Sequence, residues 1–410
     1  MLPPVAAISM SELAPSLLYA LGLGAAVALA LRQVLRETKQ VNALAKSEAN
    51  ASELTVLQPI LGGDRRLAET LSDAVRFAPQ GTHFLWLVDE DDPVGAAAAG
   101  ESLSSLDGGH AASVRVVRFG AAPPGVNPKT YKLRLALEDV STEYVAVIDD
   151  DTTVGADHLL RALRVLSAKG SDVGLYTGLP SYRASRGPGS NLVAGFVNAM
   201  AARTYLPPLQ SGPPASINGM FWVARRADLV ELRAIEEQLC DDLAVAGLFR
   251  SAGLTVHQGS MRQVLYTEGL GLFSYAARMH RWFVFAMVLM GKASLRTWLW
   301  TLSTSLGPSL LLWWAAITAL GSLRAAVALA VVLVLRHGAL GILLHATRDP
   351  SMGSGGAADR LPLSSVVAEL MVPLHAVHAL LWPRIRWRTR RYRVRRDGTF
   401  EDMAFVEVGT

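Results

Sequence analysis

The chain has 410 residues, of which 51% are hydrophobic and 18% are charged, so it is more apolar than an ordinary soluble protein. Its single cysteine, Cys240, excludes an intrachain disulfide and favours a cytoplasmic setting for the main domain. The net charge is only +4, and the basic stretch 384–396 directly follows apolar segments. This position favours a membrane surface or a phosphorylated ligand over nucleic acid.

The first predicted element is an uncharged apolar run from Leu13 to Leu31, long enough to cross a bilayer core of about 30 Å as a helix. A signal peptide fits less well, because no basic residue precedes the run. Basic residues follow it, from Arg32 to Lys46, so the positive-inside rule predicts an external N-terminus and a cytoplasmic middle of the chain. Residues 1–50 are therefore expected to form a transmembrane helix and a polar helical linker.

Strand and helix patterns alternate over residues 51–271. Strands are predicted at 54–61, 83–89, 113–119, 144–150, 173–180 and 254–259. Helices are predicted at 65–78, 132–140, 158–168 and 234–253, and a short strand or turn leads into a helix at 217–229. The alternation predicts an α/β fold with a mixed, mainly parallel sheet flanked by helices. Ligands of such folds bind beyond the carboxyl ends of the strands.

Two segments are expected to lie at the membrane surface. Residues 188–215, within the α/β domain, are apolar but rich in Pro and Gly, so an interfacial helix fits better than a span. Residues 272–296 form an amphipathic helix that leads to the membrane.

The C-terminal region, residues 297–382, contains the remaining membrane helices. Full spans are predicted at 297–320 and 323–346. A third apolar segment, 361–381, is interrupted by a proline, and as a full span it would place the basic tail 383–410 outside the cell, against the positive-inside rule. We therefore expect a kinked re-entrant or interfacial hairpin at 361–381 and a cytoplasmic tail.

Three consecutive aspartates, Asp149 to Asp151, follow the strand predicted at 144–150. Like charges stay together where water solvates them or where a cation joins them, so a solvated acidic turn is the alternative to a metal site. Mg²⁺ and Mn²⁺ prefer such oxygen ligands. Alternation along a strand puts Asp149 and Asp151 on one side, so these two are the predicted metal ligands and Asp150 is expected to be dispensable.

Two more acidic clusters are candidate functional sites. Asp89, Asp91 and Asp92 belong to the sequence DEDDP, at the end of another predicted strand, and are either a solvated loop or part of a shared site. Asp241 and Asp242 lie inside a predicted helix, where adjacent aspartates are unfavourable. Such a carboxylate could act as a general base in a cleft, or the pair could simply belong to a helix surface.

Basic and aromatic residues accompany these clusters. Lys129 and Lys132 precede the strand with the three aspartates and could hold a base or a phosphate, unless they are ordinary surface lysines. Arg278, Arg281 and Trp282, in RMHRW, offer arginine donors for a diphosphate and an indole face for a sugar ring. The alternative for RMHRW is a plain anchor at the membrane interface.

Taken in order, the motifs DEDDP, NPK, DDD, GLP, NGM, DD and RxxRW resemble those of the ceramide glucosyltransferases, membrane enzymes with a cytoplasmic GT-A domain. The resemblance covers about residues 54–282 and again 383–399, where WRTRRYRVRRDGT is similar to the family's C-terminal stretch. The chain departs from the family near residues 199–202, where it has no histidine.

The resemblance implies roles for the acidic residues. Asp92 matches the first essential aspartate, expected to contact the nucleotide, with Asp89 and Asp91 as near alternatives. Asp149 matches the second, at the metal site, where Asp151 completes a DxD pattern that eukaryotic members lack. Asp242 matches the third, expected to act as the base.

The remaining matches concern the donor. Arg278, Arg281 and Trp282 match the family's (Q/R)xxRW element, and Arg281 is expected to stabilise the leaving UDP. With Lys129, Lys132 and the DEDDP aspartates, these arginines form the expected UDP-sugar site, and Asp149 and Asp151 would hold Mg²⁺ or Mn²⁺.

The implied activity is inverting transfer of a hexose, glucose first among the candidates, from a UDP-sugar to ceramide. The product would be a β-linked glycosphingolipid made at the cytoplasmic face of a bacterial inner membrane. Transfer to a hopanoid or another lipid is an alternative, and so is a processive polysaccharide synthase, which needs more spans for a channel. A transporter with a regulatory nucleotide-binding domain fits less well, because the spans lack paired broken helices.

Overall fold

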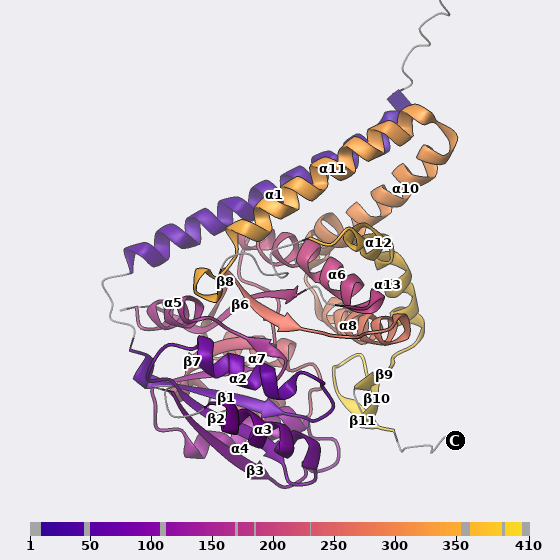
Figure 1. The fold of residues 1–410 in the computed structure, drawn as a ribbon. Coiled ribbons are helices and arrows are strands. Elements are labelled where there is room, and N and C mark those ends of the chain that lie inside the picture. Colours follow the sequence, from indigo (N-terminus) through magenta and orange to yellow (C-terminus); the bar gives the residue numbers. More distant parts are fainter. Residues whose placement is uncertain are drawn as a thin grey trace, which may run out of the picture.

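The computed structural model describes residues 10–44, 50–106, 112–168, 171–183, 186–229, 231–353, 361–387 and 390–403. An eight-stranded sheet forms the centre of the α/β domain, in the order β3-β2-β1-β4-β7-β6-β8-β5 (Figure 1). The strands are β1 (Leu54–Ile60), β2 (His83–Asp89), β3 (Ser113–Phe119), β4 (Tyr144–Ile148), β5 (Thr152–Thr153), β6 (Val173–Arg183), β7 (Phe221–Arg225) and β8 (Thr255–Tyr266).

The sheet is mixed and mainly parallel. Strands β3, β2, β1 and β4 run parallel to one another, as do β6 and β8, whereas β7 and β5 run antiparallel to their neighbours. The predicted fold class, a mainly parallel sheet flanked by helices, is therefore confirmed.

Helices cover both faces of this sheet. They are α2 (Leu67–Phe77), α3 (Pro93–Ser105), α4 (Pro128–Ala136), α5 (Ala156–Leu166), α6 (Pro188–Tyr205) and α7 (Asp241–Ser251). Val56 and Trp86 pack with residues of α2, α3 and α5, while Leu57 and Leu87 pack with α4 and α7 on the other face. Because both faces are covered, the inner strands β1, β2 and β4 are largely apolar runs in the sequence.

Short 3₁₀ segments connect several of these elements. They are η1 (Ala51–Glu53), η2 (Leu137–Asp139), η3 (Pro207–Gln210), η4 (Arg226–Leu229), η5 (Leu232–Ile235) and η7 (Pro350–Met352). The short strand predicted within 217–229 is β7, and the helix that was expected to follow it is only the 3₁₀ turn η4.

Several predicted boundaries near the strand ends are wrong. The helix predicted at 234–253 begins at Asp241, so Asp241 and Asp242 lie in its first turn and not in its interior. Acidic side chains are favourable at a helix N-terminus. Strand β4 ends at Ile148, so the three aspartates form a turn and strand alternation does not apply to them. Helix α3 was not predicted, because its Ala-, Gly- and Ser-rich sequence lacks a clear apolar stripe.

Among the described residues, three helical units are long and apolar enough to cross a membrane: α1 (Met10–Ala43), Leu295–Gly321 and α11 (Leu323–Ala346). The second unit consists of α9 (Leu295–Thr301), a π-helical turn (Leu302–Leu306) and α10 (Gly307–Gly321). Helices α1, α10 and α11 lie side by side and extend away from the sheet (Figure 1).

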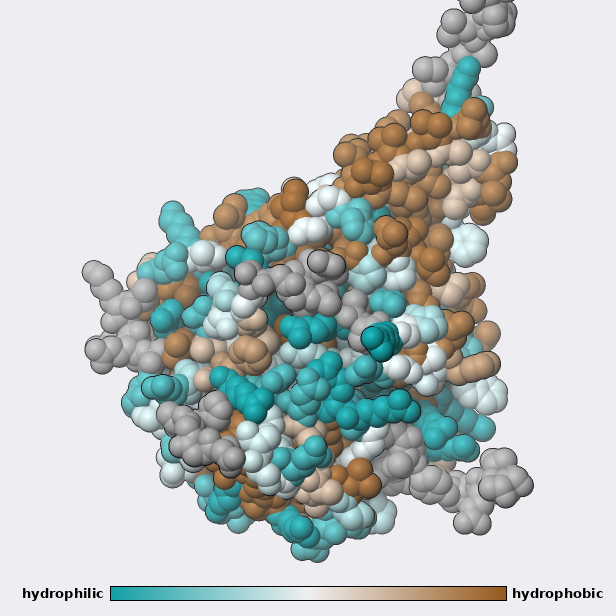
Figure 2. All heavy atoms as spheres, in the orientation of Figure 1, coloured by the Kyte–Doolittle hydropathy of each residue, from teal (hydrophilic) through white to brown (hydrophobic). Residues whose placement is uncertain are grey.

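The surface of these helices fits a lipid environment. Figure 2 shows mainly hydrophobic residues on this arm, and the side chains of Ile317, Val327 and Leu335 are exposed there. The chain is therefore membrane-associated in character, and the helices agree with the predicted spans. The predicted linker up to residue 50 falls partly on residues 45–49, outside the described ranges, and α1 itself continues to Ala43.

Three further helices join the α/β domain to the arm. Helix α8 (Leu272–Lys292) packs against α13 (Val372–Leu381) and α6. Helix α12 (Ser364–Leu370) meets α13 at 40°, beside Pro373, so the predicted kink is present.

Segment 188–215 is not an interfacial helix on the surface. Helix α6 is largely buried and packs against β6, α8 and α12, with Val193, Ala194 and Val197 in an apolar cluster. Small residues permit this close packing: a Cβ on Gly195 would lie 2.8 Å from the backbone nitrogen of Ser365.

Within the basic tail, described residues between 384 and 402, a range that excludes 388–389, form a three-stranded antiparallel sheet that was not predicted from the sequence. Its strands are β9 (Arg384–Trp387), β10 (Arg390–Val394) and β11 (Phe400–Asp402), in the order β11-β10-β9. The sheet packs on α8 through Ile385, Tyr392, Val394 and Phe400. The rest of the predicted tail, 404–410, lies outside the described residues.

Candidate active site

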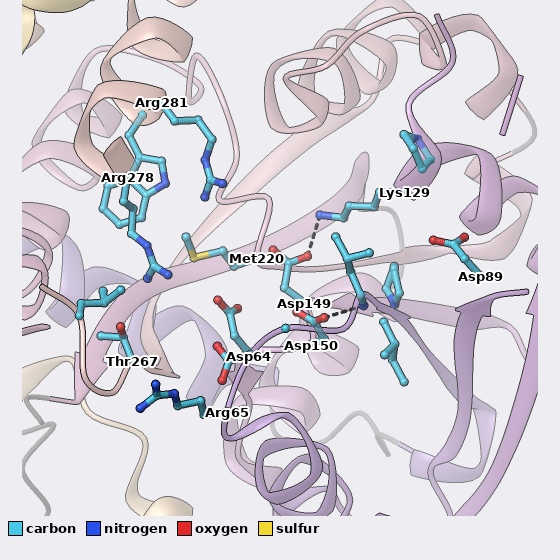
Figure 3. Close-up of a pocket in the computed structure, with 18 of the residues that line it drawn as sticks. Asp64, Arg65, Asp89, Lys129, Asp149, Asp150, Met220, Thr267, Arg278 and Arg281 are labelled. Atoms are coloured by element: carbon cyan, nitrogen blue, oxygen red, sulfur yellow. Dashed lines mark hydrogen bonds and ion pairs between the residues drawn. The ribbon is translucent and has the colours of Figure 1, made fainter. Parts of the chain in front are cut away.

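A pocket of about 400 Å³ opens at the carboxyl ends of β1, β2 and β4, where the sheet faces α8 (Figure 3). The predicted site residues that line it are Asp89, Lys129, Lys132, Asp149, Asp151, Arg278, Arg281 and Trp282. Asp91, Asp92 and Asp242 do not line it. Parallel strands collect these side chains because their carboxyl ends meet at one edge of the sheet.

The turn after β4 presents Asp149, Asp150 and Asp151 to the pocket. The turn is rigid: the backbone nitrogen of Asp149 donates to Met220 O at 3.0 Å, and Tyr266 N donates to Asp151 O at 3.2 Å. Asp150 is buried, and its Oδ2 accepts a hydrogen bond from Leu61 N at 2.8 Å. Asp150 therefore holds the loop that follows β1. The prediction that Asp150 is dispensable did not include this structural role.

Asp92 performs a similar structural task from the neighbouring strand. Its carboxylate accepts from Gly62 N at 2.6 Å and from Gly95 N at 2.9 Å, the second bond being the N-cap of α3. Asp92 and Asp150 thus hold consecutive residues of one loop, which brings Asp64 and Arg65 to the pocket (Figure 3). Asp91 is exposed.

Asp89 is the member of DEDDP that reaches the pocket. It is buried and pairs with Lys132, whose Nζ lies 3.0 Å from Asp89 Oδ1. The same ammonium donates to Ile60 O at 3.3 Å. The pair joins the ends of β1 and β2 at the wall of the pocket.

Lys129 links the acidic turn to the start of α7. Its Nζ lies 2.7 Å from Asp149 Oδ1 and 2.8 Å from Asp241 Oδ2, and it donates to Gly219 O at 3.0 Å (Figure 3 shows the first pair). The two carboxylates hold the pKa of Lys129 well above its usual value, against the opposing effect of burial. Lys129 is therefore a fixed positive charge between two acidic clusters.

Asp242 lies behind Gly219, close to the pocket without lining it. A Cβ on Gly219 would lie 3.2 Å from Asp242 Cβ, and the Cys240 thiol donates to Asp242 Oδ1 at 3.1 Å. Burial, with the nearby Asp241 charge, raises the pKa of Asp242 to about 6. A carboxylate with such a pKa can accept a proton near neutral pH.

Helix α8 supplies the opposite side of the pocket. Figure 3 shows Arg278 and Arg281 across the acidic turn from Asp89. Nη1 of Arg278 is buried and has no hydrogen-bond partner within the described part of the chain, which suits an anionic ligand. Trp282 also lines the pocket and contacts Phe196 and Tyr182, with ring centroids at 6.4 Å and 6.0 Å.

The acidic turn fits a divalent cation only with help from a ligand. Among the described residues, no three His, Cys, Asp or Glu side chains converge to hold a metal ion. Mg²⁺ needs fewer protein ligands, because it keeps waters and binds substrate phosphates. Burial raises the pKa of Asp149 to about 6; Lys129 opposes the rise, and Asp151 and Asp241 add to it. Asp149 and Asp151 therefore suit a cation that brings its own phosphate ligands.

The sequence analysis missed several pocket residues. Asp64 and Arg65 come from the loop after β1, Thr267 to Leu270 from the end of β8, and Tyr392 from the C-terminal sheet. The GGDRR stretch directly after a strand was a usable signal for the first two. Tyr392 could be found only by recognising the alternation in RRYRVRR as a strand.

The family model of glycosyl transferase family 21, the ceramide glucosyltransferase family, matches residues 19–400. The chain belongs to this family. It is therefore a glycosyltransferase of the nucleotide-sugar type, and the resemblance read from its motifs is confirmed at that level. No curated protein gives a significant match.

Solved structures of glycosyltransferases also align with this family 21 member. A mannosyltransferase from Pyrobaculum calidifontis in complex with GDP-Man and Mn²⁺ is 14% identical, with a TM-score of 0.43; 88% of this chain and 98% of that chain are covered. Glucosyl-3-phosphoglycerate synthase from Mycobacterium tuberculosis with Mn²⁺ and UDP-glucose is also 14% identical, with a TM-score of 0.32; the coverage is 63% and 84%. The family assignment rests on the sequence match.

Proposed function

We propose that this glycosyltransferase moves a hexose, glucose first among the candidates, from a UDP-sugar to ceramide with inversion. The product would be a β-linked glycosphingolipid, made on the cytoplasmic face of a bacterial inner membrane. The observation that carries the proposal is the meeting of an acidic strand end and the RxxRW helix around one pocket, with that helix leading directly into the candidate span Leu295–Gly321.

The donor diphosphate would lie between the acidic turn and α8. Asp149 and Asp151 would hold Mg²⁺ or Mn²⁺, which neutralises charge on a diphosphate leaving group. Asp89 lies at the β1–β2 end of the pocket, where it can contact the nucleotide. Arg278 and Arg281 approach from the other side and would stabilise the leaving UDP; the unpartnered Nη1 of Arg278 supports this role.

Asp242 would take the proton from the acceptor hydroxyl during a single in-line displacement at the anomeric carbon. Its raised pKa and its position beside Gly219, whose carbonyl accepts a hydrogen bond from the pocket residue Lys129, support this role. Asp242 also lies near Tyr205, at the end of α6, since its charge contributes to raising the pKa of that phenol. The base therefore lies toward the helices that join the domain to the membrane arm, from which a lipid acceptor would come.

The decisive experiment uses the full-length protein in detergent or nanodiscs, with Mg²⁺, a set of UDP-sugars and ceramide, and detects lipid products by mass spectrometry. We expect UDP release that depends on ceramide, with UDP-glucose as the best donor. Transfer to a hopanoid but not to ceramide would replace the acceptor, and lipid-independent polymer formation would overturn the proposal.

A further inference from the structure

The C-terminal sheet has one buried face and one exposed face. A tail that only binds a membrane surface does not need this pattern. Along β9 and β10, Ile385, Tyr392 and Val394 are buried, whereas Arg386, Arg391 and Arg393 are exposed. The buried set packs with Val284 and Val288 of α8 and with Leu239. The arginines of this stretch are therefore the outer face of a packed sheet.

The sheet is also bonded to the segment that precedes Asp241 and Asp242. Leu239 N donates to Gly398 O at 3.1 Å, and Gln238 and Thr399 form an antiparallel bridge. Asn127, at the N-cap of α4, holds the same segment through its Nδ2, which donates to Gln238 O at 3.0 Å. The sheet is thus fixed to the α/β domain.

A second set of bonds fixes the sheet to α8. His280 Nε2 lies 2.9 Å from Arg384 O, and Lys292 Nζ donates to Asp397 O at 2.5 Å. These contacts surround the helix that carries Arg278, Arg281 and Trp282, so the sheet and the RxxRW helix form one rigid wall.

Tyr392 is the residue of this sheet that reaches the pocket. Its side chain is 3% exposed and lines the pocket together with Leu239 and Trp282. The rings of Tyr392 and Phe400 form a T-shaped pair, with centroids 5.2 Å apart and ring planes at 90°. Phe400 does not line the pocket. Phe400 therefore supports Tyr392 from behind.

We propose that Tyr392 is a sugar-binding residue, whose ring forms the wall of the pocket against the hexose of the nucleotide sugar. The inference rests on the proposed function. Tyr392 packs in one apolar cluster with Leu239, which lies two residues before Asp241 at the start of α7, whereas Asp89 lies at the end of β2. Aromatic faces suit the C–H surface of a sugar ring.

The test compares Tyr392→Ala with Phe400→Ala in the full-length protein. Each variant removes one ring of the same pair, so both should lower the thermal stability of the protein. Only Tyr392→Ala should weaken UDP-glucose binding, by about tenfold, corresponding to the loss of one well-placed contact. Its affinity for UDP alone should stay within about twofold of the unmodified protein. Tyr392→Phe should retain UDP-glucose binding, because it keeps the ring.

The outcomes separate this inference from the proposed function. Equal loss of UDP and UDP-glucose affinity in both alanine variants, or unchanged UDP-glucose affinity in Tyr392→Ala, overturns the sugar-binding role. If the unmodified protein binds a different nucleotide sugar and not UDP-glucose, the proposed donor is wrong. The same variants are then compared with that donor and its free nucleotide, where the same selective loss is expected.

Discussion

At the scale of single residues, neighbouring carboxylates in this protein have different tasks. Asp149 and Asp151 line the pocket and the Asp149 carboxylate pairs with Lys129, whereas the carboxylates of Asp150 and Asp92 accept backbone N–H groups of the loop after β1. An acidic cluster read from sequence therefore contains both ligand candidates and structural anchors, and substitution should separate them.

Asp150→Ala should destabilise the protein by about 1–3 kcal/mol, because the partly buried Leu61 N–H loses the buried carboxylate that accepts from it. Thermal unfolding in detergent measures this change. Asp91→Ala is the matched control, since Asp91 is exposed and outside the pocket. Equal stability of the two variants would contradict the anchoring role.

Asp149→Ala should abolish the dependence of UDP binding on Mg²⁺, because the cation loses one of its two proposed protein ligands. Isothermal titration of UDP with and without Mg²⁺ measures the effect. Asp91→Ala should bind UDP like the unmodified protein. Retained Mg²⁺ dependence in Asp149→Ala would place the metal elsewhere.

Asp242→Asn should lower turnover by about 10²–10⁴-fold and leave UDP binding intact, because an amide cannot accept the acceptor's proton. For the unmodified protein, turnover should fall as the pH drops through about 6, where Asp242 becomes protonated and stops acting as a base. Rate measurements from pH 5 to pH 8 test the second part. Near-normal turnover of Asp242→Asn would disprove the assignment.

At the scale of elements, α12 is held by a buried charge network that no local sequence pattern predicts. Glu369 accepts from Arg203 of α6 at 2.6 Å, from Arg336 of α11 at 2.7 Å and from Tyr19 of α1 at 3.1 Å. The side chains of the ion-paired residues are fully buried. Side chains from three helices that are distant in sequence thus contact one carboxylate. This contact links α1 and α11 of the membrane arm to α6 and α12.

Glu369→Gln should destabilise the protein by about 3–5 kcal/mol, because two buried arginines lose their counter-charge. A lower unfolding temperature in detergent measures the loss. Glu101→Gln, an exposed position on α3, is the control and should have no effect. A stable Glu369→Gln variant would show that the network is not required to hold α12.

At the scale of the whole molecule, both ends of the hairpin 361–381 lie against the same domain. Before it, Thr347 O accepts from Arg262 N at 2.9 Å and Ser351 Oγ accepts from Asp157 N at 3.2 Å; after it, Gly398 O accepts from Leu239 N. One domain cannot lie on both sides of a bilayer, so the chain returns to the side it left. This supports three spans and a C-terminus on the side of the α/β domain.

A C-terminal tag should therefore be protected from membrane-impermeant labelling in intact spheroplasts and become labelled after lysis. An N-terminal tag is the control and should be labelled from outside. Labelling of the C-terminal tag in intact cells would contradict both the contacts and the proposed topology.

The strands and spans could be predicted because each is encoded locally. Apolar runs such as 54–61 and 323–346 carry their own period and length, and their predicted limits lie within a residue of β1 and α11. The order of motifs along the chain was enough to recognise the family. The strands of the tail were not predicted because its arginines dominate the composition, although Tyr392 and Val394 have the two-residue spacing of a strand face.

The α/β class, the membrane helices, the family and the set of chemical groups at the strand ends could be inferred from the sequence, since these depend on residues close together in the chain. Three features follow only from the folded chain: which carboxylate faces the pocket, that Lys129 joins Asp149 to Asp241, and that Tyr392 lines the site. These facts depend on contacts across long stretches of chain, such as Asp150 with Leu61 and Gly398 with Leu239. Such contacts follow from packing, which no local pattern contains.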